Sequence, residues 1–530
     1  MPRPFARSVV GVFVTALAFY LPGIGAQEIW SKDEARTALI VREMITNAQW
    51  SLPRVPGASY GRKPPLYHWL AALVASPTLD GARLRLPAAV AGAGTVALIY
   101  LFGAQLATVR VGLLAACILV SSPSFFEWAR IGRMETLLVF CMTLSLWGLG
   151  RWLAFGGLRN GMIFGVGIGL GVLTKGPAGL LPLAVAGPAL VACRPRPGRV
   201  RDLVPGLVIA LGLPLAWLAF AFLTAPDFAD YADTLVPMIA GELGRSSTSA
   251  ASLAEGLAVS MFPWTLLLPG TALMLVRAWP GTSPLLIVSL GWLAVVLVVF
   301  VVFIAPRAVY FLPAYPALAL LMAWGWETAA GRARRWLTVP LAVGGAATIA
   351  AIIATTMRSV VVRFHNDPLA LPSSIALSAG AVLLVTGVAA WRLERSHRST
   401  VALAVLAPGV LVTLLLFDVG VRTPFYNQLY PIRSTAKHFE DRIRPGVEVG
   451  YTEANRVTAL AVHLARPLRQ LSPAAIQGHP PVPAPSYIIL PDVEFAAARS
   501  GWSLERVDEV VLHRVRYVLA SVGAGAAAPR

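Results

Sequence analysis

An acidic pair, Asp33 and Glu34, follows directly after the first apolar segment of the chain, and Arg36 comes shortly after it. A carboxylate that a neighbouring guanidinium holds in place can act as a general base toward a hydroxyl group. An isolated carboxylate pair at a membrane boundary is more often a solvated interfacial group, but Arg36 at this spacing favours the catalytic interpretation. We therefore predict that Asp33 is a general base, with Glu34 and Arg36 beside it.

A cationic turn at residues 62–65 forms the second motif, in which Arg62 and Lys63 precede two prolines. Proline restricts the backbone, so the turn would hold the Lys63 ammonium in a fixed position, where it could contact a phosphate. The aromatic residues that follow also fit a simple interfacial anchor. The residues alone leave both interpretations of this turn open.

Further polar residues stand at the ends of apolar segments. Taken alone, Arg133 and Glu135 are explained by a local ion pair, and Lys175 by a plain loop position. An arginine and a tyrosine at adjacent turns could supply a charge and a hydroxyl group to one phosphate. If these residues share one side of the membrane, they can form a single substrate- and phosphate-binding site. Besides Arg62 and Lys63, the predicted members of that site are Arg133, Glu135, Lys175, Arg245, Arg307 and Tyr310.

The composition identifies the elements that must position these residues. Hydrophobic residues make up 57% of the 530 residues and charged residues only 13%, whereas about a quarter of the residues of soluble proteins are charged. Apolar runs recur at lengths that approach the roughly 20 residues needed to cross a bilayer. The chain is therefore predicted to be an α-helical polytopic membrane protein. We expect about thirteen spans, at 8–24, 83–106, 111–125, 133–153, 159–173, 177–193, 203–224, 255–277, 283–304, 309–328, 336–357, 372–392 and 400–418.

The orientation follows from arginine and lysine residues, which concentrate in the loops that a cytoplasmic N-terminus would place inside. The net charge of +18 therefore reflects membrane topology, and no nucleic-acid partner is expected. Residues 1–26 also resemble a signal peptide, but we favour an uncleaved first helix because the polar motif begins directly after it. With an odd number of spans, the predicted site and the C-terminal segment both face outward.

The last part of the chain has ordinary mixed polarity. Alternating runs at 447–451 and 487–490 are typical of strands, so we expect a small α/β domain outside the membrane. The predicted boundaries are 1–419 for the transmembrane domain, with outer loops at 25–82 and 225–254, 420–521 for the α/β domain, and 522–530 for a flexible tail.

No residue pattern demands a metal or another cofactor. The three cysteines lie in or at the ends of apolar segments without ligand spacing, so neither a zinc site nor a disulfide framework is expected. Asp33, Glu34 and Glu135 could bind a divalent cation, and metal dependence stays open.

The ordered set of motifs resembles the bacterial GT-C glycosyltransferases, above all the lipid A aminoarabinose transferases and their protein-O-mannosyltransferase-like relatives. The motifs cover roughly residues 10–330. In chain order they are Asp-Glu-x-Arg, Lys-Pro-Pro-Leu-x-x-Trp, Gly-Arg-Met-acid, Leu-Thr-Lys-Gly-Pro, Leu-Gly-Arg and Tyr-Phe-Leu-Pro.

This resemblance implies that a sugar is transferred, with inversion, from a polyprenyl (undecaprenyl) phosphate carrier to an acceptor on the periplasmic face of a bacterial inner membrane. The acceptor would be a lipid, a protein or a glycan. By motif, Asp33 takes the position of the catalytic carboxylate. Lys63, Arg245 and Tyr310 match the positions that hold the carrier phosphate.

Two positions depart from the family pattern, because Arg62 replaces its usual acidic residue and Glu135 replaces its usual aspartate. Both lie where sugar or acceptor would contact the enzyme, so the sugar and the acceptor are left open. A transporter or flippase of a lipid-linked sugar is the main alternative, and a receptor or scaffold is a further one. Transporters carry polar residues near the membrane midplane and repeated halves, whereas here the charges concentrate at one face and no repeat is evident.

Overall fold

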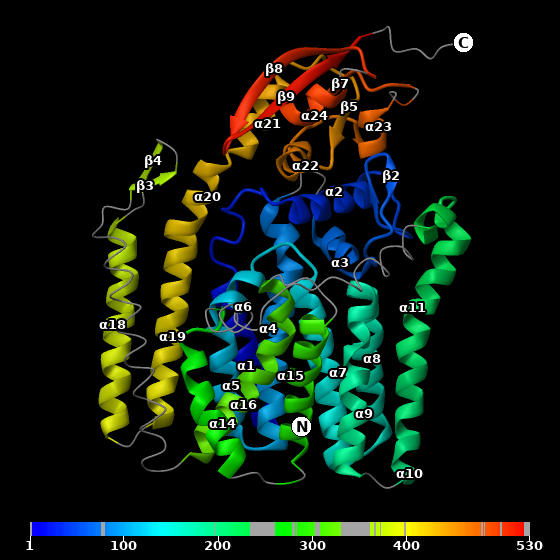
Figure 1. Ribbon diagram of the computed structural model, residues 1–530. Coiled ribbons are helices and arrows are strands. Elements are labelled where there is room, and N and C mark those ends of the chain that lie inside the picture. Colours follow the sequence, from blue (N-terminus) through cyan, green and yellow to red (C-terminus); the bar gives the residue numbers. More distant parts are fainter. Residues whose placement is uncertain are drawn as a thin grey trace.

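Three layers make up the protein: a helical bundle, a pair of short helices across one end of it, and a C-terminal α/β domain above them (Figure 1). The helical bundle and the mixed sheet confirm the predicted fold class. The computed structural model describes residues 3–75, 80–194, 197–233, 260–277, 281, 283–302, 308–329, 361–364, 367–370, 373–396, 399–478, 481, 483–498 and 501–523.

Long apolar helices form the bundle, and six helical segments of the described chain are long and apolar enough to cross a membrane. Each predicted span contains a helix except 336–357, which lies outside the described residues, so the count of thirteen stays a prediction. The helices are α1 Arg3–Tyr20, α4 Gly81–Leu106, α5 Val109–Val120, α6 Pro123–Trp128, α7 Glu135–Phe155, α8 Leu158–Lys175, α9 Leu181–Cys193, α10 Pro197–Val200, α11 Val204–Thr224, α14 Leu268–Arg277, α15 Pro284–Val302, α16 Tyr315–Thr328, α18 Ser373–Arg395 and α19 Ser399–Phe417. Short 3-10 segments at Gly176–Leu180 and Ala308–Ala314 join some of them.

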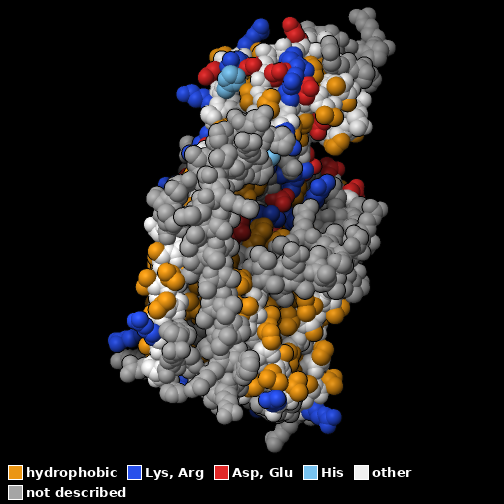
Figure 2. Space-filling view, turned by 60° about the vertical axis from the view of Figure 1, so that its left-hand side comes forward, with side chains coloured by type: hydrophobic (Ala, Val, Ile, Leu, Met, Phe, Trp, Pro, Cys, Tyr) orange, Lys and Arg blue, Asp and Glu red, His pale blue; other side chains and the backbone are white. Residues whose placement is uncertain are grey.

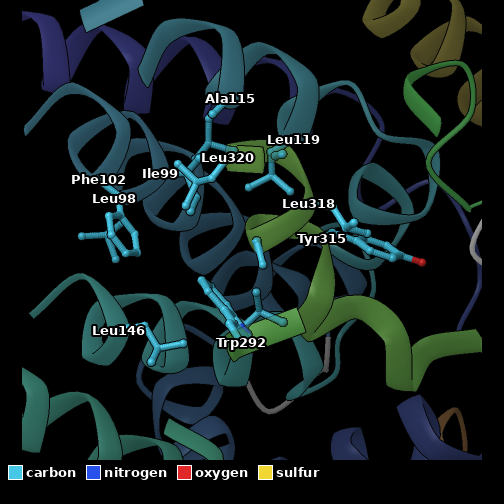
Figure 3. Close-up of a cluster of buried hydrophobic side chains, with 14 of the residues drawn as sticks. Leu98, Ile99, Phe102, Ala115, Leu119, Leu146, Trp292, Tyr315, Leu318 and Leu320 are labelled. Carbon is cyan, nitrogen blue, oxygen red and sulfur yellow. The ribbon is translucent and has the colours of Figure 1, made fainter. Parts of the chain in front are cut away.

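Two kinds of packing hold the bundle together. Where α8 meets α11, small residues let the backbones touch, as is typical of membrane helices; a Cβ atom at Gly165 would stand 1.8 Å from the carbonyl oxygen of Gly206. Elsewhere, large side chains interdigitate. Figure 3 shows Leu146 of α7, Trp292 of α15 and Leu320 of α16 in this buried core.

The segment predicted as an outer loop at 25–82 contains regular structure. Helix α2, Lys32–Thr46, lies across the end of the bundle (Figure 1), and α3, Leu66–Val74, starts directly after the proline turn. Between them, β1 Arg54–Val55 and β2 Ala58–Ser59 form a hairpin. Helix α2 has only 15 residues and several of them are charged, so its sequence does not give the signal of a membrane span.

The C-terminal domain is built on a five-stranded mixed sheet with the order β6-β5-β7-β9-β8. Strand β5 pairs in parallel with β6 and β7, whereas β9 runs antiparallel to β7 and β8. Both predicted strands are present, as β5 and β7. The strands are β5 Val449–Thr452, β6 Leu468–Leu471, β7 Tyr487–Pro491, β8 Leu504–Leu512 and β9 Val515–Val522, and the helices are α20 Thr423–Leu429, α21 Ile432–Glu440, α22 Asn455–Val462, α23 Pro473–Gln477 and α24 Asp492–Ala498. A separate hairpin joins β3 Val361–Phe364 to β4 Asp367–Ala370.

A shared hydrophobic core fixes this domain to α2. Leu39 of α2 and Leu460 of α22 are fully buried in the same cluster, and burial of apolar surface stabilises such contacts. The Arg42 guanidinium of α2 also donates to the carbonyl oxygens of Val462 and Leu464, at 3.4 and 3.2 Å. The C-terminal domain is therefore held firmly over the end of the bundle where the predicted site lies.

Candidate functional site

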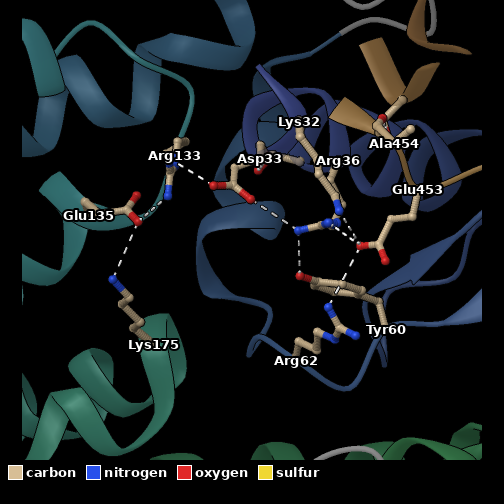
Figure 4. Close-up of polar contacts among 12 residues, drawn as sticks. Lys32, Asp33, Arg36, Tyr60, Arg62, Arg133, Glu135, Lys175, Glu453 and Ala454 are labelled. Carbon is tan, nitrogen blue, oxygen red and sulfur yellow. Dashed lines mark hydrogen bonds and ion pairs between the residues drawn. The ribbon is translucent and has the colours of Figure 1, made fainter. Parts of the chain in front are cut away.

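Predicted site residues from separate parts of the chain converge in a row of alternating charges between the bundle and the C-terminal domain (Figure 4). Figure 2 shows basic and acidic side chains gathered in a recess beneath this domain, whereas hydrophobic side chains cover much of the lower body. We call this arrangement the charged row. Its members, from α8 to the C-terminal domain, are Lys175, Glu135, Arg133, Asp33, Arg36 and Glu453.

Asp33 stands near the middle of the charged row, in the first turn of α2, where the helix dipole favours a carboxylate. Its Oδ1 accepts a hydrogen bond from Arg36 Nη1 at 3.3 Å, and its Oδ2 lies 3.2 Å from Arg133 Nη1. The Asp33 side chain is 36% exposed, against 20% for Glu453 and 7% for Glu135. Two guanidinium groups thus orient a carboxylate that solvent can reach, as a general base requires.

Glu135 occupies the deeper part of the charged row, at the start of α7. Its Oε1 accepts a hydrogen bond from Arg133 Nη2 at 2.8 Å and lies 3.5 Å from Lys175 Nζ. Glu135 Oε2 is buried and has no hydrogen-bond partner among the described residues. The Lys175 ammonium also lies 5.1 Å from the centre of the Tyr310 ring, so the structure brings four of the predicted residues into one group.

Glu453 closes the other end of the charged row and was not predicted from the sequence. It follows β5 directly, and its Oε1 pairs with Arg36 Nη2. The same oxygen lies 3.6 Å from Lys32 Nζ and 3.9 Å from Arg62 Nη1. Arg36 is further fixed by Tyr60, whose hydroxyl oxygen accepts a hydrogen bond from Nη1 at 3.2 Å. The available signal was position, since ligand sites often lie at the carboxyl ends of parallel strands.

Glu34 differs from its neighbour Asp33 because it is almost wholly buried, at 3% exposure. Arg85 Nε and Nη2 donate to its two carboxylate oxygens at 2.7 and 3.1 Å, and the Gly132 N–H donates to Oε1 at 2.8 Å. Burial alone would raise the pKa of Glu34, but Arg85 and the Gly132 N–H lower it below its ordinary value. The side chain thus joins α2, α4 and the turn before α7.

Lys63 lies in the proline turn, half-buried beside the deeper part of the charged row. The turn is fixed from outside, because the Tyr231 hydroxyl donates to the Lys63 carbonyl oxygen at 3.5 Å. The Lys63 charge acts on the nearby His68, whose side chain is buried; burial and then Lys63 lower the pKa of His68 to about 4. His68 is therefore neutral at physiological pH, and a cation stands beside it.

Two predicted residues, Arg245 and Arg307, lie outside the described residues. The described parts of the chain contain no cluster of three or more histidine, cysteine, aspartate or glutamate residues that could hold a metal ion. The carboxylates considered as metal ligands are engaged by arginine or lysine side chains instead.

Part of the chain is similar in sequence to known glycosyltransferases. A family model described as dolichyl-phosphate-mannose-protein mannosyltransferase matches residues 62–220. An undecaprenyl phosphate-α-4-amino-4-deoxy-L-arabinose arabinosyl transferase of Aeromonas hydrophila is 28% identical over 321 residues, 58% of each chain. A second such transferase, from Pseudomonas fluorescens, is 28% identical over 322 residues, 57% of this chain and 53% of that protein. This chain thus spans little more than half the length of these relatives.

Solved structures extend the likeness to nearly the whole chain. Apo ArnT of Cupriavidus metallidurans matches with a TM-score of 0.77 and 18% identity, covering 99% of this chain and 100% of that one. The same protein bound to undecaprenyl phosphate matches with a TM-score of 0.76 and 17% identity over 98% and 99% of the two chains. The chain is therefore a multi-pass inner-membrane protein with the GT-C fold. Within this fold it is related to the aminoarabinose transferases and the protein mannosyltransferases.

Proposed function

We propose that the protein transfers a sugar from a polyprenyl phosphate carrier, such as undecaprenyl phosphate, to a lipid, protein or glycan acceptor. The observation that carries this proposal is the Asp33 carboxylate, exposed to solvent and held between Arg36 and Arg133 in a GT-C fold. The names of the related transferases support the choice of carrier.

The proposed reaction is a displacement at the anomeric carbon with inversion. The acceptor hydroxyl oxygen forms a bond to that carbon while Asp33 takes the hydroxyl proton. At the same time the bond from the carbon to the phosphate oxygen breaks, and the carrier phosphate leaves with the electron pair. Cations fixed before the reaction stabilise the charge that develops on this phosphate.

We assign the leaving phosphate to the cationic side of the site. Lys63 and Lys175 approach it from the proline turn and from the end of α8, and Tyr310 lies beside Lys175. The family motifs add Arg245, and Arg307 lies close in sequence to Tyr310. The unpartnered Oε2 of Glu135 would accept a hydrogen bond from the sugar.

The remaining charges orient the base or face the acceptor. Arg133 lies between the two carboxylates, Asp33 and Glu135, so we assign it to holding Asp33 in place. Glu34 is too deeply buried to touch a substrate and fixes the start of α2 instead. Arg62, at 58% the most exposed cation among the described residues of the site, stands at the mouth and would meet the acceptor.

The site and the C-terminal domain are proposed to face the periplasm. Support comes from basic residues at the opposite end of the bundle: Arg151 near the end of α7, Arg159 at the start of α8 and Arg199 in α10. Polyprenyl-linked sugars would then reach the site from the outer leaflet.

Mass spectrometry of envelope lipids and glycoproteins from cells with and without the gene tests the proposal. We expect a mass difference of one sugar on an acceptor, restored by the wild-type gene and by Asp441→Asn, which changes an exposed carboxylate of the C-terminal domain. Identical envelopes would contradict the proposal. A change in the sidedness of a lipid-linked sugar, without loss of any transferred sugar, would instead indicate a flippase.

A further inference from the structure

A second network of charges lies beside the charged row and is built from other residues. Asp418 Oδ2 lies 3.0 Å from Arg130 Nε and 2.9 Å from Arg130 Nη2, and its Oδ1 accepts a hydrogen bond from Arg422 Nε at 2.6 Å. Arg422 Nη1 also forms an ion pair with the Glu127 carboxylate. Arg130 and Asp418 are only 4% and 6% exposed. The network is neutral in total charge, and its Arg130–Asp418 pair is closed to water.

The network joins the helical segment that leads to the C-terminal domain with the turn that carries Arg133. Asp418 and Arg422 bound a π-helical turn between α19 and α20, the continuous helical stalk that carries the C-terminal domain (Figure 1). A π-helical turn within a helix often marks a functional site. Arg130 belongs to the short turn between α6 and α7, which also contains Gly132 and Arg133.

This short turn, residues 129–134, is held from two directions. Asp418 fixes Arg130 at its start, and Glu34 accepts the N–H of Gly132 near its end. Arg133 follows directly and reaches Asp33 and Glu135. A buried ion pair adds little net stability because desolvation offsets its attraction, so its main effect here is to define where the turn lies.

We propose that Asp418 is a positioning residue, which acts through Arg130 to hold the turn so that Arg133 stays in contact with Asp33. Asp418 itself touches no substrate. The inference rests on the proposed glycosyl transfer, because its consequence is the orientation of the base. It also gives the stalk of the C-terminal domain a direct mechanical connection to the site.

The test compares transfer with carrier binding in Asp418→Asn. Transfer is measured as sugar-modified acceptor in the envelope per amount of protein in the membrane, and binding as the Kd of purified protein for undecaprenyl phosphate. Because misplacing a catalytic group by about 1 Å can cost about 100-fold in rate, we expect transfer to fall about 10- to 100-fold and the Kd to change less than about twofold. Glu127→Gln, at the 44% exposed rim of the same network, is the matched control and should keep both values.

A second comparison separates positioning from general damage. In an Arg133→Ala background, where Asp33 has already lost its contact with Arg133 and keeps the one with Arg36, adding Asp418→Asn should lower transfer less than about twofold, since coupled sites are not additive. If Asp418→Asn does not reach the membrane, Asp418→Glu keeps the charge, changes the geometry and gives the same comparison.

The outcomes separate this inference from the proposed function. Full transfer by the Asp418 variants, parallel loss of transfer and carrier binding, or an undiminished effect in the Arg133→Ala background would each overturn the positioning role while wild-type transfer remains. No wild-type transfer and no binding of undecaprenyl phosphate would overturn the proposed function itself, and the positioning role with it.

Discussion

Arg36 of α2 and Glu453 of the C-terminal domain form an ion pair across 417 residues of sequence. Arg36 also contacts Asp33, the proposed base, so the C-terminal domain reaches the candidate site through one shared guanidinium. The site is therefore complete only when this domain sits on the bundle.

Replacing Glu453 by glutamine should loosen the domain above the site. Arg36 would lose one of its two charged partners and keep Asp33, and hydrogen bonds to charged groups contribute about 1.5–3 kcal/mol each. We expect faster amide hydrogen exchange in α2 and in the β5–α22 loop, together with reduced sugar transfer. Glu505→Gln, on the exposed strand β8, serves as the control. Unchanged exchange in Glu453→Gln would show that the shared hydrophobic core alone fixes the domain.

Replacing Glu34 by glutamine should destabilise the protein without touching a substrate. Arg85 would remain buried without its counter-charge, a change that typically costs about 3–5 kcal/mol. We expect a lower unfolding temperature of the purified protein in detergent, whereas Glu43→Gln in the same helix should have little effect. An unfolding temperature equal to that of wild type would contradict the structural role.

The same pair predicts a dependence on acid. The pKa of Glu34 is lower in the folded protein than the ordinary value of about 4.3, so its charge stabilises the fold above that pH. This contribution disappears as the pH falls through the lowered pKa. Wild type should thus lose stability faster than Glu34→Gln below about pH 4. If stability falls equally with pH in the two proteins, the Glu34 carboxylate is not the cause of the acid dependence.

Buried His68 should make the fold sensitive to mild acid. Its pKa is lowered to about 4 in the folded protein, against about 6.5 in the unfolded chain. Between these values the unfolded chain binds a proton that the folded protein does not, so about 3 kcal/mol of stability is lost as the pH falls. Denaturant unfolding of wild type and His68→Gln at pH 7 and pH 5 measures the effect. We expect the stability difference between the two proteins to change with pH, and a constant difference would contradict it.

Lys175→Met should weaken binding of the carrier. The substitution keeps the length of the side chain but removes the charge that would contact the phosphate, a loss of about 1.5–3 kcal/mol. The Kd of the purified protein for undecaprenyl phosphate should therefore rise about 10- to 100-fold. Lys437→Met, in α21 of the C-terminal domain, should leave the Kd unchanged. Equal affinities in the two variants would remove Lys175 from the proposed phosphate site.

Short motifs predicted much of the site because each carries its charges at the end of an element. The helices that start or end near Asp33, Arg133 and Lys175 meet at one face of the bundle. The predicted orientation of the chain in the membrane was therefore enough to group these residues on one side. Strands β5 and β7 could also be predicted, since their alternating pattern differs from that of the apolar spans.

Contacts between distant segments could not be predicted in the same way. Glu453 stands in a domain of ordinary composition, and no local pattern relates it to Arg36. Arg85 falls inside a predicted span, where only the fold shows that it neutralises Glu34. Helix α2 was not predicted from the sequence. Its apolar face is buried by the C-terminal domain and not by lipid, so it lacks the pattern of a membrane span.

Asp33 is the proposed acceptor of the hydroxyl proton, and Asp33→Asn removes this capacity. This isosteric variant keeps the size of the side chain but cannot act as the base. Purified wild type and variant are compared for binding of undecaprenyl phosphate, and cells carrying each are compared for the sugar-modified acceptor. Carrier binding should stay within about twofold, while transfer should fall at least about 100-fold, the lower range for loss of a general base. Wild-type levels of transfer by Asp33→Asn would contradict this role of Asp33.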